Sequence, residues 1–510
     1  MSELKKEIAI SLRNLTKKFG NVKANDNVSM DIYKGEILSL LGENGSGKTT
    51  LMNMLAGIYY PDAGEIFING KEVKISSPKD AFDLGIGMVH QHFKLIDVLS
   101  ATENIILGEE GKLDINLAKN KIKDICSRYG FEIDLDQKIY NMSVSQKQTV
   151  EIVKVIYRGA DILILDEPTA VLTPQETEKL FAVMRNMRDD GKSIIIITHK
   201  LNEVKEISNR VVVLRQGAYV GEMITSETNA QEMTDMMVGR KVTLNIERPK
   251  PLEEPTPRIV VEGLSVKDEE GVWKLKDINF TANSGEILGI AGISGCGQKE
   301  LLEAIAGLQP VESGSIKYIE DDNNVEELIG KDPREISDIG VALSFVPEDR
   351  LGMGLVGNMD LAENMMLRSF RNNSSPFTDR KTPTALAETI VNNLEVKTPG
   401  INTPVRKLSG GNVQKVLVGR EIANSPSVLM TAYAVRGLDI NSSYAIYDLI
   451  NMQKLKGVAV IFVGEDLDVL LQLSDRILVL CDGQVSGIID GDKADKNQVG
   501  MMMTKLGGEE

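Results

Sequence analysis

The segment GENGSGKT, Gly42 to Thr49, has the residue types and spacing of a loop that binds phosphate groups. It follows an apolar run and leads into a helical pattern, which is the context this motif requires. Backbone N–H groups of such a loop and of the helix start hold phosphate oxygens. We expect Lys48 to reach the β- and γ-phosphates of ATP and the Thr49 hydroxyl to bind Mg²⁺. The residues expected around the nucleotide here are Gly42, Asn44, Gly45, Ser46, Gly47, Lys48, Thr49 and Thr50.

Two carboxylates, Asp166 and Glu167, end the apolar run in DILILDEPTA. A strand of this kind delivers both side chains to one edge of a sheet. Asp166 suits Mg²⁺ coordination, and Glu167 suits general-base polarisation of an attacking water. His199 ends the next apolar run, IIIITH, where it can hydrogen-bond a γ-phosphate. A lone histidine in such a place is more often structural, but the ordered series of motifs favours the phosphate role.

Short apolar runs that alternate with longer helical patterns must position these side chains. The runs lie at 37–41, 162–165, 193–198 and 211–214. Fully apolar strands separated by helices predict an α/β fold with a mainly parallel sheet that is covered on both faces.

The chain contains two copies of one long repeat. YKGEILSLLGENGSGKTTLMNMLAG begins at Tyr33, and NSGEILGIAGISGCGQKELLEAIAG begins at Asn283. Copies of this length indicate a duplicated domain rather than a solenoid. Between them, the proline-rich stretch IERPKPLEEPTPR predicts an extended linker. We therefore expect a first domain at 1–245, a linker at 246–257 and a second domain at 258–510.

The composition is that of a globular protein with well-filled cores. Of its 510 residues, 42% are hydrophobic and 26% are charged, with a net charge of −16. The acidic balance argues against non-specific binding to nucleic acid. Three scattered cysteines form no CxxC motif, as expected in a reducing compartment. The apolar runs are too short to span a bilayer, so we expect a membrane role only through partner proteins.

The order of the phosphate loop, Gln91, a serine–glycine signature, LDEPT and THK resembles an ABC-type ATPase over nearly the whole chain. The resemblance implies two tandem P-loop ATPase domains, each with a helical subdomain that carries the signature. It further implies that Gln91 senses Mg²⁺ and contacts membrane subunits, and that Phe19 stacks on adenine. Simple packing is the alternative for Phe19. The HQH triplet at 90–92 lacks the cysteine or acidic neighbours of a metal pair.

The second copy keeps the glycines of the loop and loses the chemistry. The residues that replace Lys48, Thr49, Asp166, Glu167 and His199 are Gln298, Lys299, Ala432, Tyr433 and Glu465. Glu269 stands where the first copy has Phe19, and Trp273 lies nearby. A mechanism that depends on phosphate positioning and charge neutralisation cannot operate with this set.

The signature shows the opposite asymmetry. LSGGN, Leu408 to Asn412, is intact in the second copy, whereas MSVSQ in the first has Ser145 in place of a glycine. Asp439 likewise corresponds to Thr173. In ABC proteins two domains close head-to-tail, which would join the intact signature residues to the intact phosphate loop. Site one, formed by the first phosphate loop and the second signature, would then be complete with Ser409, Gly410, Gly411 and Asp439. Site two, formed by the second phosphate loop and the first signature, would be altered in both of its parts. It would either hold nucleotide passively or act as a hinge.

VPEDR and MMVGRKV, at 346–350 and 236–242, resemble the energy-coupling subunit of bacterial simple-sugar and nucleoside importers. HQHFKL and MSVSQKQTVEI favour the nucleoside branch over the ribose or galactose type. The resemblance implies ATP and Mg²⁺ as ligands, two permease subunits and an extracytoplasmic solute-binding protein or lipoprotein as partners, and a peripheral place on the cytoplasmic face of the membrane. Gln91, His92, Phe93 and Glu348 would face the permease. Twin ABC translation factors on ribosomes are a further alternative, but those typically keep both glutamate bases and a long charged linker.

Overall fold

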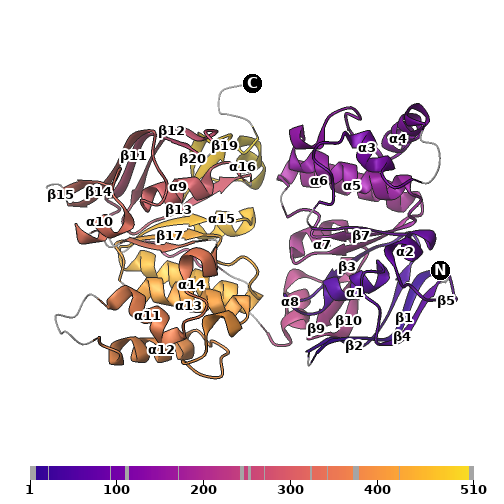
Figure 1. Cartoon of the computed structure of the whole chain (residues 1–510), viewed down its shortest axis with the longest axis horizontal. Helices are drawn as coiled ribbons and strands as arrows, with labels where there is room; N and C mark the ends of the chain where they lie inside the picture. The colour runs from indigo at the N-terminus through magenta and orange to yellow at the C-terminus, as the bar shows by residue number, and fades with distance from the viewer. Residues whose placement is uncertain are drawn as a thin grey trace. The chain divides into compact units, whose positions relative to one another are not determined.

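The structure is a computed structural model that describes residues 7–20, 22–91, 93–109, 114–170, 172–241, 246–250, 254–268, 270–293, 295–321, 324–339, 341, 343–347, 349–370, 378–423 and 425–504. His92, Val242, Glu269 and Glu348 lie outside the described residues. The chain divides into two compact units, Met1–Thr243 and Leu244–Glu510. Figure 1 colours the first unit from indigo to magenta and the second mainly from orange to yellow.

The first unit is built on a six-stranded sheet in the order β10-β9-β3-β8-β7-β6. The strands are β3 (Ile37–Leu41), β6 (Ile86–Val89), β7 (Ile162–Asp166), β8 (Ser193–Ile197), β9 (Arg210–Arg215) and β10 (Ala218–Ile224). All neighbours pair in parallel except β9 and β10. Every residue of β3, β7 and β8 is buried, because helices or a second sheet cover both faces. The predicted α/β fold with a mainly parallel sheet is confirmed.

A second, antiparallel sheet lies against one face of the first. Its order is β2-β1-β4-β5, with β1 (Ile8–Phe19), β2 (Val22–Tyr33), β4 (Ala63–Ile68) and β5 (Lys71–Val73). Apolar residues of this sheet share a core with α1 (Lys48–Leu55) and one face of β3, β7 and β8. Figure 1 shows α1 between the two sheets, with α5 and α6 on the opposite face of the parallel sheet.

The remaining helices form a lobe and several connections. The lobe has its own core and contains α3 (Ala101–Ile106), α4 (Ile115–Tyr129), the 3-10 turn η1 (Ile139–Asn141) and α5 (Val144–Tyr157). The connections are α2 (Pro78–Asp83), α6 (Pro174–Asp189), α7 (Leu201–Ile207), η2 (Thr225–Glu227) and α8 (Ala230–Val238).

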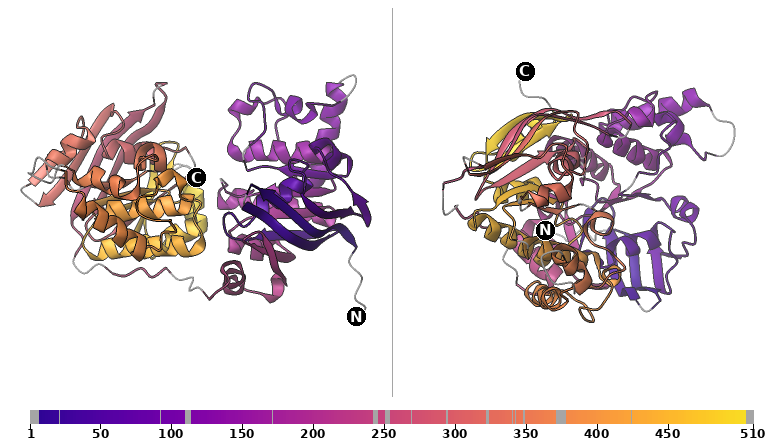
Figure 2. Two further views of the ribbon diagram at one scale, coloured as in Figure 1. Left: turned by 60° about the horizontal axis from the view of Figure 1, so that its bottom comes forward. Right: turned by 60° about the vertical axis from the view of Figure 1, so that its left-hand side comes forward.

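The second unit repeats this plan. Its larger sheet has the order β16-β17-β18-β13-β19-β20, and its antiparallel sheet has the order β12-β11-β14-β15. The strands are β11 (Pro257–Lys267), β12 (Trp273–Asn283), β13 (Ile287–Gly292), β14 (Ser313–Asp321), β15 (Asn324–Glu327), β16 (Leu343–Val346), β17 (Val428–Ala432), β18 (Ala459–Val463), β19 (Arg476–Cys481) and β20 (Gln484–Asp490). Figure 2 shows the layers of both units from two further directions.

The described helices of the second unit follow the same order, with one addition and without a counterpart of η2. They are α9 (Gln298–Ile305), α10 (Pro333–Asp338), α11 (Leu361–Ser369), α12 (Lys381–Asn393), η4 (Val405–Lys407), α13 (Gly410–Ala423), α14 (Ile440–Leu455), α15 (Leu467–Leu473) and α16 (Lys496–Met502). The addition is a π-helix, η3 (Arg350–Gly354), directly after β16. In the first unit the described residues 93–100 form no helix at this place.

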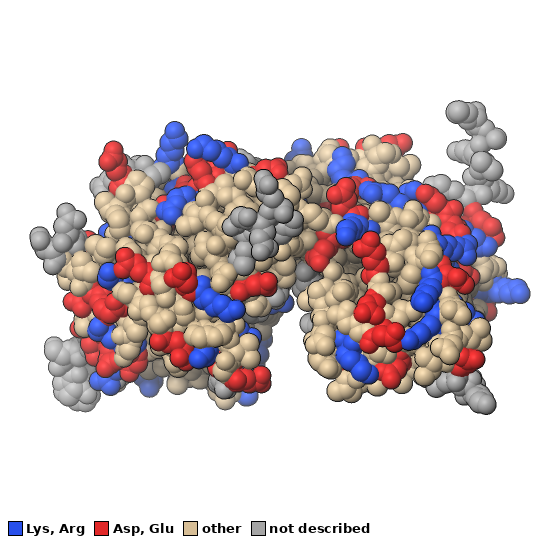
Figure 3. Space-filling view, turned by 90° about the horizontal axis from the view of Figure 1, so that it is seen from above, with Lys and Arg blue, Asp and Glu red and all other residues tan. Residues whose placement is uncertain are grey.

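Part of the expected linker packs on the second unit. Ile246 is buried in its core, and the Asn451 side chain donates a 2.7 Å hydrogen bond to the Glu247 carbonyl. Arg248 Nη1 donates to the Ser474 carbonyl at 2.5 Å. Charged side chains of both signs are interspersed over the face seen in Figure 3.

Candidate active site

The phosphate loop of the first unit joins β3 to α1, as its sequence context predicts. Gly45 and Gly47 have φ of 79° and 94°, in the left-handed region that favours glycine. A Cβ atom on Gly47 would overlap the Ala24 carbonyl oxygen and lie 2.7 Å from Asn25 Nδ2. At Gly45 the same atom would meet nothing within 4 Å. The loop is therefore fixed against β2 at Gly47 and open at Gly45.

Polar groups line this loop. Lys48 Nζ donates to the carbonyl oxygens of Gly42 at 2.7 Å and Glu43 at 3.0 Å, which centres the ammonium inside the loop. Burial lowers the pKa of Lys48, and the charges of nearby carboxylates oppose that shift. The Ser46 hydroxyl is buried with no hydrogen-bond partner among the described residues. Asn44 and Thr49 are exposed, and Thr50 is half-buried in the first turn of α1.

Asp166 ends β7 beside the phosphate loop and is 8% exposed. Burial, followed by the charge of Glu167, raises the pKa of Asp166 to about 6, while Lys48 and the nearby Thr49 side chain act in the opposite direction. A carboxylate beside a hydroxyl at the end of a phosphate loop provides the oxygen donors that Mg²⁺ prefers.

Glu167 follows Asp166 with an unusual backbone. Its φ is 49°, and its N–H donates to the Ile197 carbonyl at 2.9 Å, which ties the turn to β8. Oε1 lies 2.8 Å from His199 Nδ1. Oε2 is buried, and no group in the described ranges hydrogen-bonds to it. One carboxylate oxygen is thus positioned by His199 and the other retains its capacity to accept a proton.

Gln91 and Phe19 lie at the margin of this cluster. Gln91 is exposed and follows β6, the neighbour of β7. Phe19 ends β1 and is 44% exposed, with its ring 5.2 Å from that of Tyr59 in an edge-on arrangement. Lys17 Nζ lies 5.6 Å from the centre of the Phe19 ring. Within the described residues, no hydrogen bond joins Gln91 or Phe19 to Lys48, Asp166 or Glu167.

The second unit preserves the backbone of the site. Gly295 and Gly297 have φ of 90° and 98°, and Tyr433 has φ of 53°. The Tyr433 N–H donates to the Val463 carbonyl at 3.0 Å, as Glu167 does to Ile197. Gln298 Nε2 donates to the Ile293 carbonyl at 3.1 Å, in the place where Lys48 bonds Glu43.

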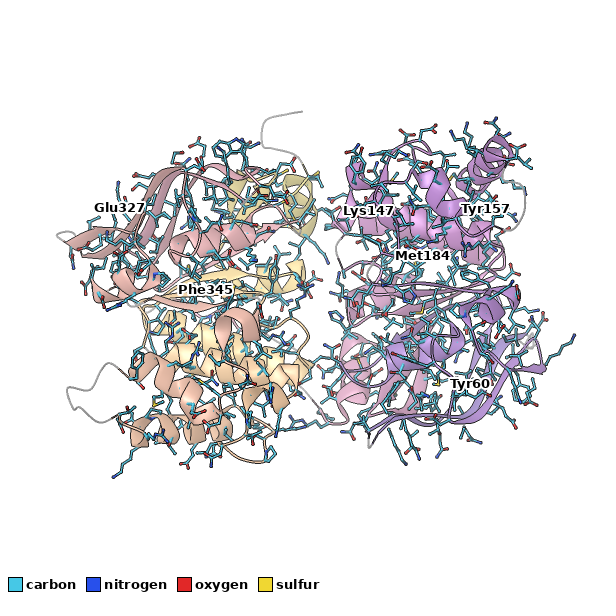
Figure 4. The ribbon with its side chains drawn as sticks, viewed as in Figure 1. Tyr60, Lys147, Tyr157, Met184, Glu327 and Phe345 are labelled. Atoms are coloured by element: carbon cyan, nitrogen blue, oxygen red, sulfur yellow. The ribbon has the colours of Figure 1, made fainter. Side chains whose placement is uncertain are left out.

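Its chemistry is different. Ala432 and Lys299 line a cavity of about 280 Å³ together with Glu303, Phe345, Asp349 and Met353. Figure 4 labels Phe345, which lies on β16. The Glu465 carboxylate, in the place of His199, forms a 3.0 Å ion pair with Arg436. The Arg436 guanidinium also lies 6.0 Å from the centre of the Tyr433 ring. A phenol, Tyr433, therefore stands in the place of Glu167, and a carboxylate held in an ion pair stands in the place of His199.

Trp273 of the second unit lies exposed at the start of β12, with Lys267 Nζ 4.3 Å from its ring centre. This places an aromatic ring in the region where the first unit has Phe19, at a different position in the sequence.

The two signature segments differ in how they begin their helices. Ser409 is exposed immediately before α13, and its Oγ accepts a 2.8 Å hydrogen bond from Asn412 Nδ2. Gly410 and Gly411 form the first turn of α13. Ser143 caps α5, since its Oγ accepts the Gln146 N–H while the Gln146 side chain bonds back.

Asp439 and Thr173 both cap helices. The two Asp439 carboxylate oxygens accept the N–H and hydroxyl of Ser442 at 2.9 and 2.6 Å. Thr173 Oγ1 accepts the N–H of Glu176 at 3.3 Å. Arg350 and Arg436, which bond backbone or side-chain groups around these segments, were not identified as site residues from the sequence. The VPEDR and AVRGLD motifs were the available signal for them.

Comparison with known proteins agrees with this arrangement. A family model described as ABC transporter matches residues 25–170 and 275–431, one match in each unit. The chain is 41% identical to the nucleoside import ATP-binding protein NupA of Lactococcus lactis, over 98% of both chains. The chain belongs to the ABC transporter family.

Two further ABC relatives match over the same length. The guanosine import ATP-binding protein NupO of Bacillus subtilis is 40% identical, over 98% of this chain and 97% of its own. The glucose import ATP-binding protein TsgD13 of Haloferax volcanii is 38% identical, over 98% and 96%. The expected resemblance, the two ABC ATPase domains and the ATP-hydrolysing class are confirmed. No helix in the described part of this ABC protein has the length and apolarity to cross a membrane.

Proposed function

We propose that this ABC ATPase drives the import of a nucleoside and hydrolyses ATP at one composite site. The observation that carries the proposal is the distribution of intact groups between the units. The first unit has the lysine, the paired carboxylates and the Glu167–His199 contact, whereas the second has an exposed Ser409 at the head of an unaltered signature helix. Head-to-tail closure would unite these two intact sets and leave the altered sets together.

In the proposed site each residue of the first unit has one role. Phe19 offers an exposed ring for adenine, and the 42–50 loop surrounds the phosphates with Lys48 beside the β- and γ-phosphates. Glu167 accepts a proton from the attacking water through Oε2, while His199 fixes Oε1 and faces the γ-phosphate.

Mg²⁺ and the signature residues of the second unit would neutralise the remaining charge on the phosphates of ATP. Thr49, Asp166 and Gln91 would hold Mg²⁺, because the first two already adjoin and Gln91 follows the neighbouring strand. When bound, the metal neutralises charge on the phosphates. Ser409, Gly410 and Gly411 would present the N–H groups of the α13 N-terminus to the γ-phosphate. In the second unit Ala432, at the end of β17, stands in the place of Asp166, so we expect no hydrolysis at its phosphate loop.

The nature of the solute is inferred from relatives. The names of two similar proteins refer to nucleoside and guanosine import, at 41% and 40% identity, and a third refers to glucose import at 38%. These values favour a nucleoside and leave a simple sugar as the second candidate. In such an assembly the chain would lie on the cytoplasmic face, bound to two permease subunits that receive solute from a binding protein.

The test is transport by proteoliposomes that contain the chain and its permease pair with the solute-binding protein. We expect ATP-dependent uptake of labelled guanosine, competition by other nucleosides but not by ribose or glucose, and loss of uptake with Glu167→Gln. Uptake of a sugar without a nucleoside would overturn the solute assignment. Stimulation of ATP hydrolysis by ribosomes and not by the permease would overturn the transport role.

A further inference from the structure

The π-helix η3 is a feature of the second unit that the described residues of the first unit lack, and it lies close to the signature segment. Asp349 begins η3, and its Oδ1 accepts the N–H groups of Leu351 and Gly352 at 3.2 and 2.8 Å. A π-helix is rare and is often found at functional positions. Here it follows β16, the strand beside β17, and it places Arg350 next to two segments that are distant in sequence.

Arg350 joins those two segments through its guanidinium. Nη1 donates to the carbonyl of Gly410, the first residue of α13, at 3.2 Å. Nη2 donates to the carbonyl of Arg436, in the loop that leads from β17 to α14. The planar fork of arginine fixes the separation and direction of both acceptors, which a flexible lysine cannot do. The start of the signature helix is thereby tied to the loop that contains Asp439.

The other end of η3 is fixed to the same helix. Arg420 on α13 donates to the Gly354 carbonyl at 2.7 Å. Arg420 is itself paired at 2.8 Å with Glu421, which is 0% exposed and also pairs with Arg368 on α11 at 2.6 Å. A Cβ on Gly354 would lie 2.7 Å from Leu417 Cδ2, so η3 packs closely on α13. The π-helix is thus attached to α13 near both ends of that helix.

The loop that contains Arg436, the second partner of Arg350, is also held by an ion pair. The Arg436 side chain pairs with Glu465 and approaches the Tyr433 ring. The corresponding residues of the first unit are Ala170, His199 and Glu167, of which the last two form the catalytic pair. In the second unit, therefore, an arginine at the Ala170 position pairs with the residue that replaces His199 and approaches the residue that replaces Glu167.

We infer that Arg350 is a positioning residue for ATP hydrolysis, which holds the head of α13 in the orientation that Ser409, Gly410 and Gly411 need to complete the site of the first unit. The inference rests on the proposed composite site, since the signature acts on nucleotide only in that arrangement. It predicts that Arg350, which lies in the second unit, affects the rate of ATP hydrolysis. The affinity for ATP should depend on the first unit and should not change when Arg350 is replaced.

The test uses the full chain and compares Arg350→Ala with Arg334→Ala. Arg334 lies on α10 with its side chain 68% exposed, and it pairs with an equally exposed Asp338. We expect Arg350→Ala to lower kcat at least about tenfold while the Kd for ATP changes less than about twofold. Arg334→Ala should leave both unchanged. Rates are expressed per folded molecule, using the melting curve of each variant.

A double-mutant cycle with Ser409→Ala separates positioning from general damage. If Arg350 acts through the signature, its effect shrinks to less than about threefold in the Ser409→Ala background. The inference would be overturned if the Arg350→Ala and Ser409→Ala substitutions lowered kcat by independent factors that multiply in the double variant. It would also be overturned if Arg350→Ala had the same rate as Arg334→Ala, or if it weakened the Kd for ATP and left kcat unchanged. A Ser409→Ala variant with full activity would instead overturn the composite site itself.

Discussion

Glu167 and His199 meet across the ends of β7 and β8, with Glu167 Oε1 2.8 Å from His199 Nδ1. The left-handed backbone of Glu167, with φ of 49°, directs the carboxylate toward this contact. Tyr433 has nearly the same φ, 53°, at the matching position of the second unit, although its side chain is a phenol and not a carboxylate. The conformation therefore belongs to the turn after this strand, and only in the first unit does the turn carry a side chain that can act as a base.

The first prediction concerns the base. Glu167→Gln keeps the side-chain volume and the ability to bond His199, but removes the proton acceptor. We expect steady-state ATP hydrolysis to fall by roughly 10²–10⁴-fold, with little change in ATP affinity measured by equilibrium binding. Tyr433→Phe is the matched control in the second unit and should keep wild-type turnover. More than about a tenth of the wild-type rate in Glu167→Gln would show that another group is the base.

The second prediction concerns the pH dependence of stability. Burial raises the pKa of Asp166 to about 6 from an ordinary value of 3.8, so the folded state binds a proton more tightly than the unfolded chain. Through this group, stability falls as pH rises from about 4 to 6, and the cost at neutral pH is on the order of 2–3 kcal/mol. Asp166→Asn should raise the melting temperature at pH 7.5 and have little effect near pH 4.

The same carboxyl group gives a linked prediction for the metal. Because a carboxylate binds Mg²⁺ only when it is deprotonated, Mg²⁺-dependent ATP binding should weaken as pH falls below about 6. Titration of Mg²⁺ at several pH values checks this. Affinity that is constant between pH 5 and 7.5 would argue against Asp166 as a ligand.

The fourth prediction compares glycines of the two phosphate loops. Gly47→Ala should abolish ATP binding, because its Cβ would overlap the Ala24 carbonyl oxygen. Gly45→Ala meets open space and should cost only the backbone strain, about 1–2 kcal/mol. Gly297→Ala, with Leu275 Cδ2 at 2.5 Å from the new atom, should lower stability but leave ATP affinity unchanged. Equal loss of affinity in Gly47→Ala and Gly297→Ala would contradict the assignment of binding to the first loop.

Much of this site could be predicted because its residues follow strands in fixed order. Lys48, Asp166 and Glu167 belong to continuous motifs, and the end of each parallel strand brings them to one sheet edge. Arg350 could not be placed in this way, because its partners are the backbone carbonyls of Gly410 and Arg436, which no side-chain pattern marks. The antiparallel sheets were likewise missed, since their long strands are only partly buried and interrupted by bulges.

The central claim is that one composite site hydrolyses ATP, and the direct measurement compares the rates of Ser409→Arg and Ser143→Arg. Ser143 caps α5, so its replacement costs about 1 kcal/mol of stability, and both rates must be expressed per folded molecule. We predict that Ser409→Arg lowers hydrolysis at least about a hundredfold although it lies in the unit without a base, while Ser143→Arg remains within about threefold of the wild type. Equal damage from both substitutions would contradict the account.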